Sequence, residues 1–156
     1  MRVAVIVLEN HGFDEVIGNP DAPFLNALAK RGALATRYHA IAHPSLPNYI
    51  ALIGGSTLGI DENCTECSAY GDNLGAQLSR AGLSWRAYME DMPEACYDGD
   101  THAGYVKRHN PFMYFPSVVD DPSLCENVVP ADQLDEDLRA AALPAFEHAH
   151  QRQRLQ

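Results

Sequence analysis

One stretch, HPSLPNYIALIGGSTLGI at residues 43–60, decides how the rest of the chain is interpreted. Ser45 stands between Pro44 and Pro47, and a residue that precedes proline avoids the helical region. The apolar residues 48–53 then predict a short helix that ends at a glycine pair. We therefore expect Ser45 at or just before the N-terminus of a helix, with Pro47 near the first turn, where its missing N–H costs least.

The position of Ser45 suggests a chemical role. Backbone N–H groups and the positive end of the helix dipole meet at a helix N-terminus, which favours a phosphate or another oxyanion. A hydroxyl held at such a place can act as a nucleophile. The alternative is that Ser45 serves only as the N-cap of the helix.

Length and charge restrict the class of protein. A chain of 156 residues is one domain, and it can bury about 70 % of its unfolded surface. The formal net charge of −10 argues against DNA or RNA as a partner, although a local cationic site or a bound metal could still attract a phosphate. No apolar run is long enough to span a membrane.

The four cysteines do not form a zinc motif. Cys64 and Cys67 are close in sequence, but Cys96 and Cys125 do not supply the second close pair that a site of this kind needs. Two disulfides are compatible with the count, in a pairing that the sequence does not fix, and they favour an oxidising compartment. The start of the chain shows no signal-peptide pattern, so we expect either a cytoplasmic protein or one whose leader has been removed.

A polar cluster follows the first predicted strand. Residues 2–8 form a continuous apolar and β-branched run, typical of a buried parallel strand. Glu9 and Asn10 follow it directly, at the edge of the sheet where ligands bind in open α/β folds. Both supply hard oxygen ligands for a divalent cation, and the alternative is an ordinary turn or helix cap.

The next elements alternate between helix and strand. Residues 24–30 predict a helix, and residues 33–42 predict a second strand that leads to Ser45. This alternation favours an α/β layered fold. Both polar clusters then follow strand ends and could face one another.

The second half of the chain contains two helices and a strand separated by a long irregular segment. Asn73 is expected to cap a helix at 74–81, and 84–88 and 132–142 predict a strand and a helix. The irregular segment 90–121 contains HNPFMYF at residues 109–115, and such long segments in compact domains are often functional. Its aromatic residues are expected to anchor the core.

Two groups of histidines have alternative interpretations. His109 could contact phosphate or transfer protons, or could be a surface-loop histidine. The residues EHAHQRQRLQ at 147–156 show no buried pattern and are expected to fray. Within them, His148 and His150 have the spacing of a chelate on a strand, but a solvated tail is the favoured interpretation.

Together, these motifs resemble a bacterial phosphoesterase family that contains acid phosphatases and phospholipases C, within the alkaline phosphatase superfamily. The resemblance rests on five segments in the right order: VIVLENHGFDEVIG, APFLNALAKRGALATRYHAIAHPSLPNYIALIGGST, SWRAYMEDMP, KRHNPFMYF and VVPADQLDEDLRAAALPAF. It implies an alkaline-phosphatase-like α/β layered sandwich, with a central, mostly parallel sheet and an active site at the C-terminal ends of the strands.

The resemblance also implies a site and a reaction. Glu9 and Asn10 match the first metal-binding pair of the family, and Ser45 matches its nucleophile, which also binds the metal. His43 and His109 lie in matching motifs as possible phosphate contacts. The implied reaction is divalent-metal-dependent hydrolysis of a phosphate ester through a phosphoseryl intermediate, and the implied location is the periplasm or the exterior.

The resemblance stops at Phe146, so residues 1–146 correspond to the N-terminal part of a phosphoesterase domain and 147–156 form a tail unlike the family. The chain therefore resembles a fold truncated at its C-terminus. An unpaired sheet edge would follow, which an oligomer or a partner chain could cover. The alternative function is a non-catalytic remnant that acts as a binding or interaction module. The metal, and the choice between a small phosphate monoester and a diester such as a phospholipid headgroup, stay open.

Overall fold

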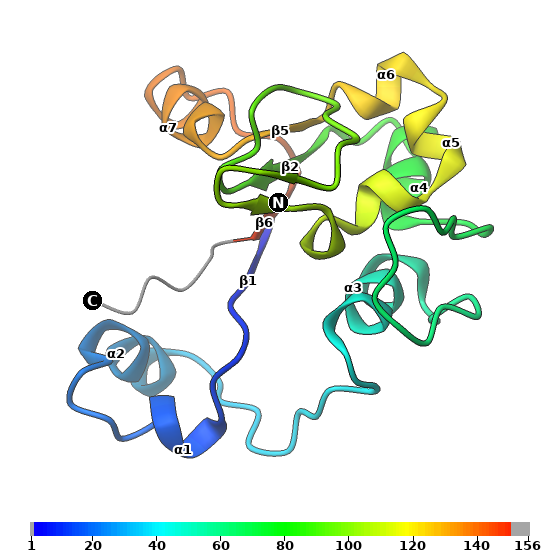
Figure 1. The fold of residues 1–156 in the computed structure, drawn as a ribbon. Helices are drawn as coiled ribbons and strands as arrows, with labels where there is room; N and C mark the ends of the chain where they lie inside the picture. The colour runs from blue at the N-terminus through cyan, green and yellow to red at the C-terminus, as the bar shows by residue number, and fades with distance from the viewer. Residues whose placement is uncertain (1, 151–156) are drawn as a thin grey trace. The chain divides into compact units, whose positions relative to one another are not determined.

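The structure, a computed structural model, describes residues 2–150 (Figure 1). The chain forms two compact units. One contains the residues up to Leu8 together with those from Ile41 onward, and the other contains Glu9–Ala40.

The larger unit is built on a parallel sheet of four strands in the order β1-β6-β2-β5. The strands are β1 (Val3–Val7), β2 (Trp85–Met89), β5 (Val128–Pro130) and β6 (Phe146–His150). In register, His148 of β6 lies between Val5 of β1 and Ala87 of β2. The expected α/β class with a central parallel sheet is confirmed.

Helices cover both faces of this sheet (Figure 1). Helix α3 (Ser45–Gly54), α4 (Leu74–Arg80) and the 3-10 helices η1 (Lys107–His109) and η2 (Pro111–Tyr114) pack on one face. Helix α7 (Asp132–Arg139) lies on the other. Short helices α5 (Pro116–Val119) and α6 (Pro122–Cys125) follow η2, and a hairpin of β3 (Thr101–His102) and β4 (Tyr105–Val106) precedes η1.

The aromatic motif of the irregular segment anchors the core, as predicted. Phe112 and Phe115 are fully buried, and the ring of Phe112 stacks on Trp85 of β2 with 5.0 Å between centroids. Gly75 of α4 lies against the same indole, because a Cβ at this glycine would stand only 2.8 Å from Trp85 Cζ2. The absence of a side chain at Gly75 therefore lets α4 approach the sheet.

A buried polar cluster joins β2 to α7 on the opposite face. Asp137 is 5 % exposed, and it accepts hydrogen bonds from Arg86, from the hydroxyl of Tyr88 at 2.7 Å and from Gln133 at 3.2 Å. Odd-numbered residues of β2 therefore face α4 and η2, and even-numbered ones face α7, as the two-residue period of a strand requires.

The smaller unit contains α1 (Phe13–Val16) and α2 (Pro23–Arg31). The side chain of Asn26 stabilises the segment between these two helices. Its amide donates to the carbonyls of Val16, Asn19 and Ala22, and its oxygen accepts from Gly18 N. The predicted helix 24–30 is confirmed within α2.

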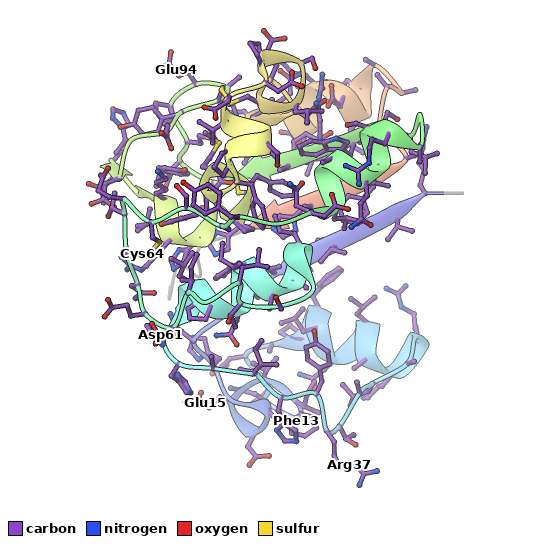
Figure 2. All side chains as sticks on the ribbon, turned by 90° about the vertical axis from the view of Figure 1, so that its right-hand side faces the viewer. Phe13, Glu15, Arg37, Asp61, Cys64 and Glu94 are labelled. Atoms are coloured by element: carbon purple, nitrogen blue, oxygen red, sulfur yellow. A yellow bond between two sulfur atoms is a disulfide. The ribbon has the colours of Figure 1, made fainter. Side chains whose placement is uncertain are left out.

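Two disulfides join the cysteines as Cys64–Cys67 and Cys96–Cys125. Figure 2 shows Cys64 on the loop that leads from α3 to α4, and Asp61 on the same loop. None of the described helices combines the length and the apolar character that crossing a bilayer requires.

The strand predicted at residues 33–42 is wrong. The structure shows loop and turn there, and the backbone N–H groups of Ile41 and Ala42 donate to the side chain of Asn48 instead of to a neighbouring strand. The apolar character of the segment was therefore not sufficient evidence for a strand without a pairing partner.

The expected fraying of 147–150 is also wrong, and residues 151–156 lie outside the described part. Residues 147–150 belong to β6, which has β1 on one side and β2 on the other. Backbone hydrogen bonds on both sides stabilise this strand despite its polar composition. The sequence hid it because Glu147, His148 and His150 remove the apolar run that marks a buried strand.

In the described part of the chain, β1 pairs only with β6 and forms one edge of the sheet. Its apolar residues Val3 and Ile6 are 46 % and 65 % exposed. This edge matches the expectation of an incompletely covered sheet.

Candidate active site at the C-terminal edge of the sheet

The C-terminal ends of three adjacent parallel strands meet at one edge. His150, the last residue of β6, lies in register with Val7 of β1 and with Met89 of β2. Ligands of open α/β sheets bind at such an edge. Glu9 and Asn10 follow Val7 in the chain by two and three residues.

Ser45 is the first residue of α3, as the sequence predicted, and it is half-buried. The turn before it is fixed by Asn48, whose oxygen accepts from Ile41 N and Ala42 N. The amide of Asn48 donates to the carbonyls of Ala42 at 2.9 Å and Pro44 at 3.0 Å. One side chain thus holds the segment that presents the Ser45 hydroxyl.

The helix N-terminus offers fewer amide donors than the sequence suggested. The N–H of Leu46 donates to Asn63 Oδ1 at 3.1 Å, and Pro47 has no N–H. Two of the first-turn amides are therefore not available to an oxyanion. An oxyanion bound near Ser45 would therefore need other groups to stabilise its charge.

Three rings cluster beside the same face of α3. The ring of Tyr49 lies 5.6 Å from that of His109 and 5.6 Å from that of His150, and the two imidazoles are 4.7 Å apart between centroids. Tyr49 is one helical turn after Ser45, so both residues lie on one face of the helix. The structure thus brings His109 to the α3 face that carries Ser45.

His148, two residues before His150, lies deeper on the same face of β6. It is 1 % exposed, its ring meets Phe112 edge-on at 5.5 Å, and neither ring nitrogen has a hydrogen-bond partner among the described residues. Burial, with a smaller contribution from His150, lowers its pKa to about 4. His148 is therefore a neutral core residue.

The other residues singled out from the sequence lie as follows. Glu9 and Asn10 belong to the smaller unit, where Asn10 Nδ2 donates to Glu9 Oε1 at 3.3 Å. His43 is exposed and stands two residues before Ser45. Sequence reasoning missed Tyr49, and it assigned His150 to a solvated tail in preference to a chelate on a strand. The only signal for His150 was its alternation with His148 on what proved to be a strand.

Comparisons with known proteins agree with this architecture. A model of the phosphoesterase family matches residues 19–154, a range that includes most of the segment expected to lie outside the family. The chain is 36 % identical to the phosphatidylinositol-3-phosphatase of Mycobacterium tuberculosis over 118 residues, which are 75 % of this chain and 40 % of that protein.

Two fungal relatives match over more of this chain. The phosphate-repressible acid phosphatase of Penicillium chrysogenum is 35 % identical over 92 % of this chain and 35 % of its own length. The probable acid phosphatase of Kluyveromyces lactis is 31 % identical over 93 % of this chain and 36 % of its own length. The chain thus spans about two-fifths or less of these relatives, and it belongs to the phosphoesterase family.

Proposed function

We propose that this chain carries part of the active site of a phosphoric ester hydrolase that acts on phosphate monoesters. Membership of the phosphoesterase family is the observation that carries the proposal. The matched relatives are named as acid phosphatases and a phosphatidylinositol-3-phosphatase, which favours hydrolysis over a non-catalytic binding role and a monoester over a diester.

In this proposal Ser45 is the nucleophile. Its hydroxyl gives up its proton to solvent, and Oγ forms a bond to phosphorus as the bond from phosphorus to the ester oxygen breaks. The departing alkoxide takes up a proton from solvent and leaves as the alcohol. Water then attacks the phosphorus of the phosphoserine and gives up a proton, the bond from Oγ to phosphorus breaks, Oγ takes up a proton, and phosphate leaves. The position of Ser45 at the first residue of α3, in a turn fixed by Asn48, supports this role.

Glu9, Asn10 and Ser45 are the residues that would hold a divalent metal ion. Carboxylate, amide and hydroxyl oxygens suit such an ion, and the hydrogen bond between Asn10 and Glu9 keeps the first two donors together. A bound cation would lower the pKa of the Ser45 hydroxyl and neutralise charge on the phosphate oxygens. The loss of amide donors at Leu46 and Pro47 makes this contribution more important.

His43 and His109 are the proposed phosphate contacts. His109 is half-buried and packs on Tyr49, one turn from Ser45, whereas His43 is exposed and close to Ser45 in sequence. The two disulfides support a further proposal, that the protein works in an oxidising compartment.

Hydrolysis of p-nitrophenyl phosphate with added divalent metal tests the function. We expect Ser45→Ala to abolish turnover, while Ser68→Ala, which changes an exposed serine of the same unit, leaves it intact. An unchanged rate in Ser45→Ala would disprove the nucleophile. A wild-type chain that folds but hydrolyses neither p-nitrophenyl phosphate nor bis(p-nitrophenyl) phosphate would favour the non-catalytic alternative, and preference for the second compound would indicate a diesterase.

A further inference from the structure

We propose that His109 and His150 form a two-imidazole binding site for a borderline divalent transition metal ion, represented by Zn²⁺. The inference deepens the proposed function, on which its catalytic meaning rests, because it assigns His109 to a metal ion in place of a direct phosphate contact and names the class of metal that an imidazole pair binds. The binding itself can be measured without turnover.

Both histidines are presented by ordered elements of the larger unit. His150 ends the central strand β6 and is 8 % exposed, and β1 and β2 hold its backbone on both sides. His109 ends η1 and is half-buried. Tyr49 of α3 contacts both rings and limits their freedom. A rigid support of this kind lowers the conformational entropy that metal binding must overcome.

The separation of the two donors fits one metal ion after a small movement. A ring nitrogen of His109 and one of His150 lie within 4.8 Å of each other. Two zinc–nitrogen bonds of about 2.0–2.1 Å at a tetrahedral angle place the nitrogens about 3.3 Å apart. The two nitrogens must therefore approach one another by at most about 1.5 Å. A small rotation of the half-buried His109 side chain within its rotamer can bring them that much closer.

Ligand chemistry then selects the metal. Imidazole nitrogen is a good ligand for Zn²⁺, Ni²⁺ and Cu²⁺, whereas Mg²⁺ and Ca²⁺ prefer sites made of oxygen atoms alone. The formal net charge of −10 at pH 7 also favours accumulation of cations near the protein. A pair of imidazoles at the sheet edge therefore predicts selectivity for a transition metal over Mg²⁺.

Zn²⁺ titration of the purified chain, without an affinity tag, tests the site, and competition with a chromophoric chelator measures the affinity. The visible spectrum of the Co²⁺-bound protein gives an independent readout. We expect His109→Ala and His150→Ala each to weaken Zn²⁺ binding by at least about tenfold, a loss of about 1.4 kcal/mol. Both should also change the Co²⁺ spectrum. His102→Ala, which changes an exposed histidine of the β3–β4 hairpin, should leave both unchanged. Excess Mg²⁺ should not displace Zn²⁺.

Unchanged Zn²⁺ affinity in His109→Ala, which alters only a half-buried side chain, would overturn the site even if His150→Ala failed to fold. An equal loss in His102→Ala would do the same, because binding would then be non-specific. The two proposals can fail separately. If the wild-type chain has no phosphatase activity but both histidine variants lose Zn²⁺ binding, the metal site is supported and the proposed function is not. Phosphatase activity that requires Ser45, together with a Zn²⁺ affinity that is unchanged in both histidine variants, would support the proposed function and overturn the metal site.

Discussion

Asn48 Nδ2 donates a hydrogen bond to the carbonyl oxygen of Pro44 at 3.0 Å, so the first turn of α3 fixes the residue that precedes Ser45. The same side chain accepts from Ile41 and Ala42 through its oxygen. Asn48 therefore holds the backbone segment that precedes Ser45, and in the proposed mechanism it would be a positioning residue for the Ser45 hydroxyl.

Replacing Asn48 should reduce activity more than stability explains. Asn48→Ala removes every one of these hydrogen bonds, and we expect it to lower the free energy of unfolding by about 1–3 kcal/mol. It should also lower kcat for p-nitrophenyl phosphate at temperatures where the variant is fully folded, since misplacement of a nucleophile is costly. Denaturant unfolding and steady-state kinetics measure the two effects separately.

Asn127→Ala is the matched control for this prediction. Asn127 also donates to two backbone carbonyls, those of Ser123 and Leu124, but it serves the end of α6. We expect a similar loss of stability without a loss of kcat. Equal effects of both variants on kcat would show that Asn48 acts only through stability.

The sequence predicted the elements that carry clear local signals, such as a capping residue, a proline in the first turn or a terminating glycine. Helix α3, which begins at Ser45, has Pro47 in its first turn and is capped at its C-terminus by Gly55, whose φ of 75° lies in the left-handed region that glycine favours. Asn73 caps α4 by accepting from Ala76 N at 2.9 Å. Such signals operate within a few residues and can be read without tertiary context.

The sequence could not predict features that depend on distant partners. β6 is a strand because β1 and β2 flank it, and residues 33–42 are a loop because they have no such neighbours. The same limit applied to the site. The spacing of His148 and His150 indicates a chelate on a strand, but sequence alone favours a solvated tail there. The strand register instead places His150 at the sheet edge, with its ring beside that of Tyr49.

His148→Leu should stabilise the protein. The buried imidazole of His148 has neither nitrogen hydrogen-bonded within the described residues, so its polar atoms incur a desolvation cost with no compensation. A leucine of similar volume removes that cost and keeps contact with Phe112, and we expect a gain of about 1–2 kcal/mol in the free energy of unfolding. Urea denaturation at neutral pH checks the sign, and a loss of stability would show that the imidazole has a partner in solution.

The two disulfides should differ in their effect on stability. Cys96–Cys125 spans 29 residues and joins the segment after β2 to α6, whereas Cys64–Cys67 spans 3. The entropy of loop closure predicts a loss of about 3–4 kcal/mol when the first is removed and about 2 kcal/mol for the second. Thermal unfolding of Cys96→Ala/Cys125→Ala and Cys64→Ala/Cys67→Ala double variants tests the order, and the reverse order would contradict the loop-length argument.

Acid should weaken the link between β2 and α7. Burial alone would raise the pKa of Asp137, but hydrogen bonds from Arg86, Tyr88 and Gln133 outweigh it, and the pKa is lowered. A carboxyl group whose pKa is lower in the folded state contributes stability above its unfolded pKa. That contribution disappears as the pH falls through the folded value.

We therefore expect Asp137→Asn to cost about 2 kcal/mol at neutral pH, since the partly exposed Arg86 would lose its buried partner. The difference between wild type and this variant should be constant above about pH 5 and should shrink below about pH 4. Asp135→Asn is the control, because Asp135 lies on the same helix in an exposed pair with Arg139 at 3.6 Å. Denaturant unfolding across this pH range decides the matter: a difference that stays constant down to pH 3 would mean that the Asp137 carboxylate is not what links α7 to the sheet.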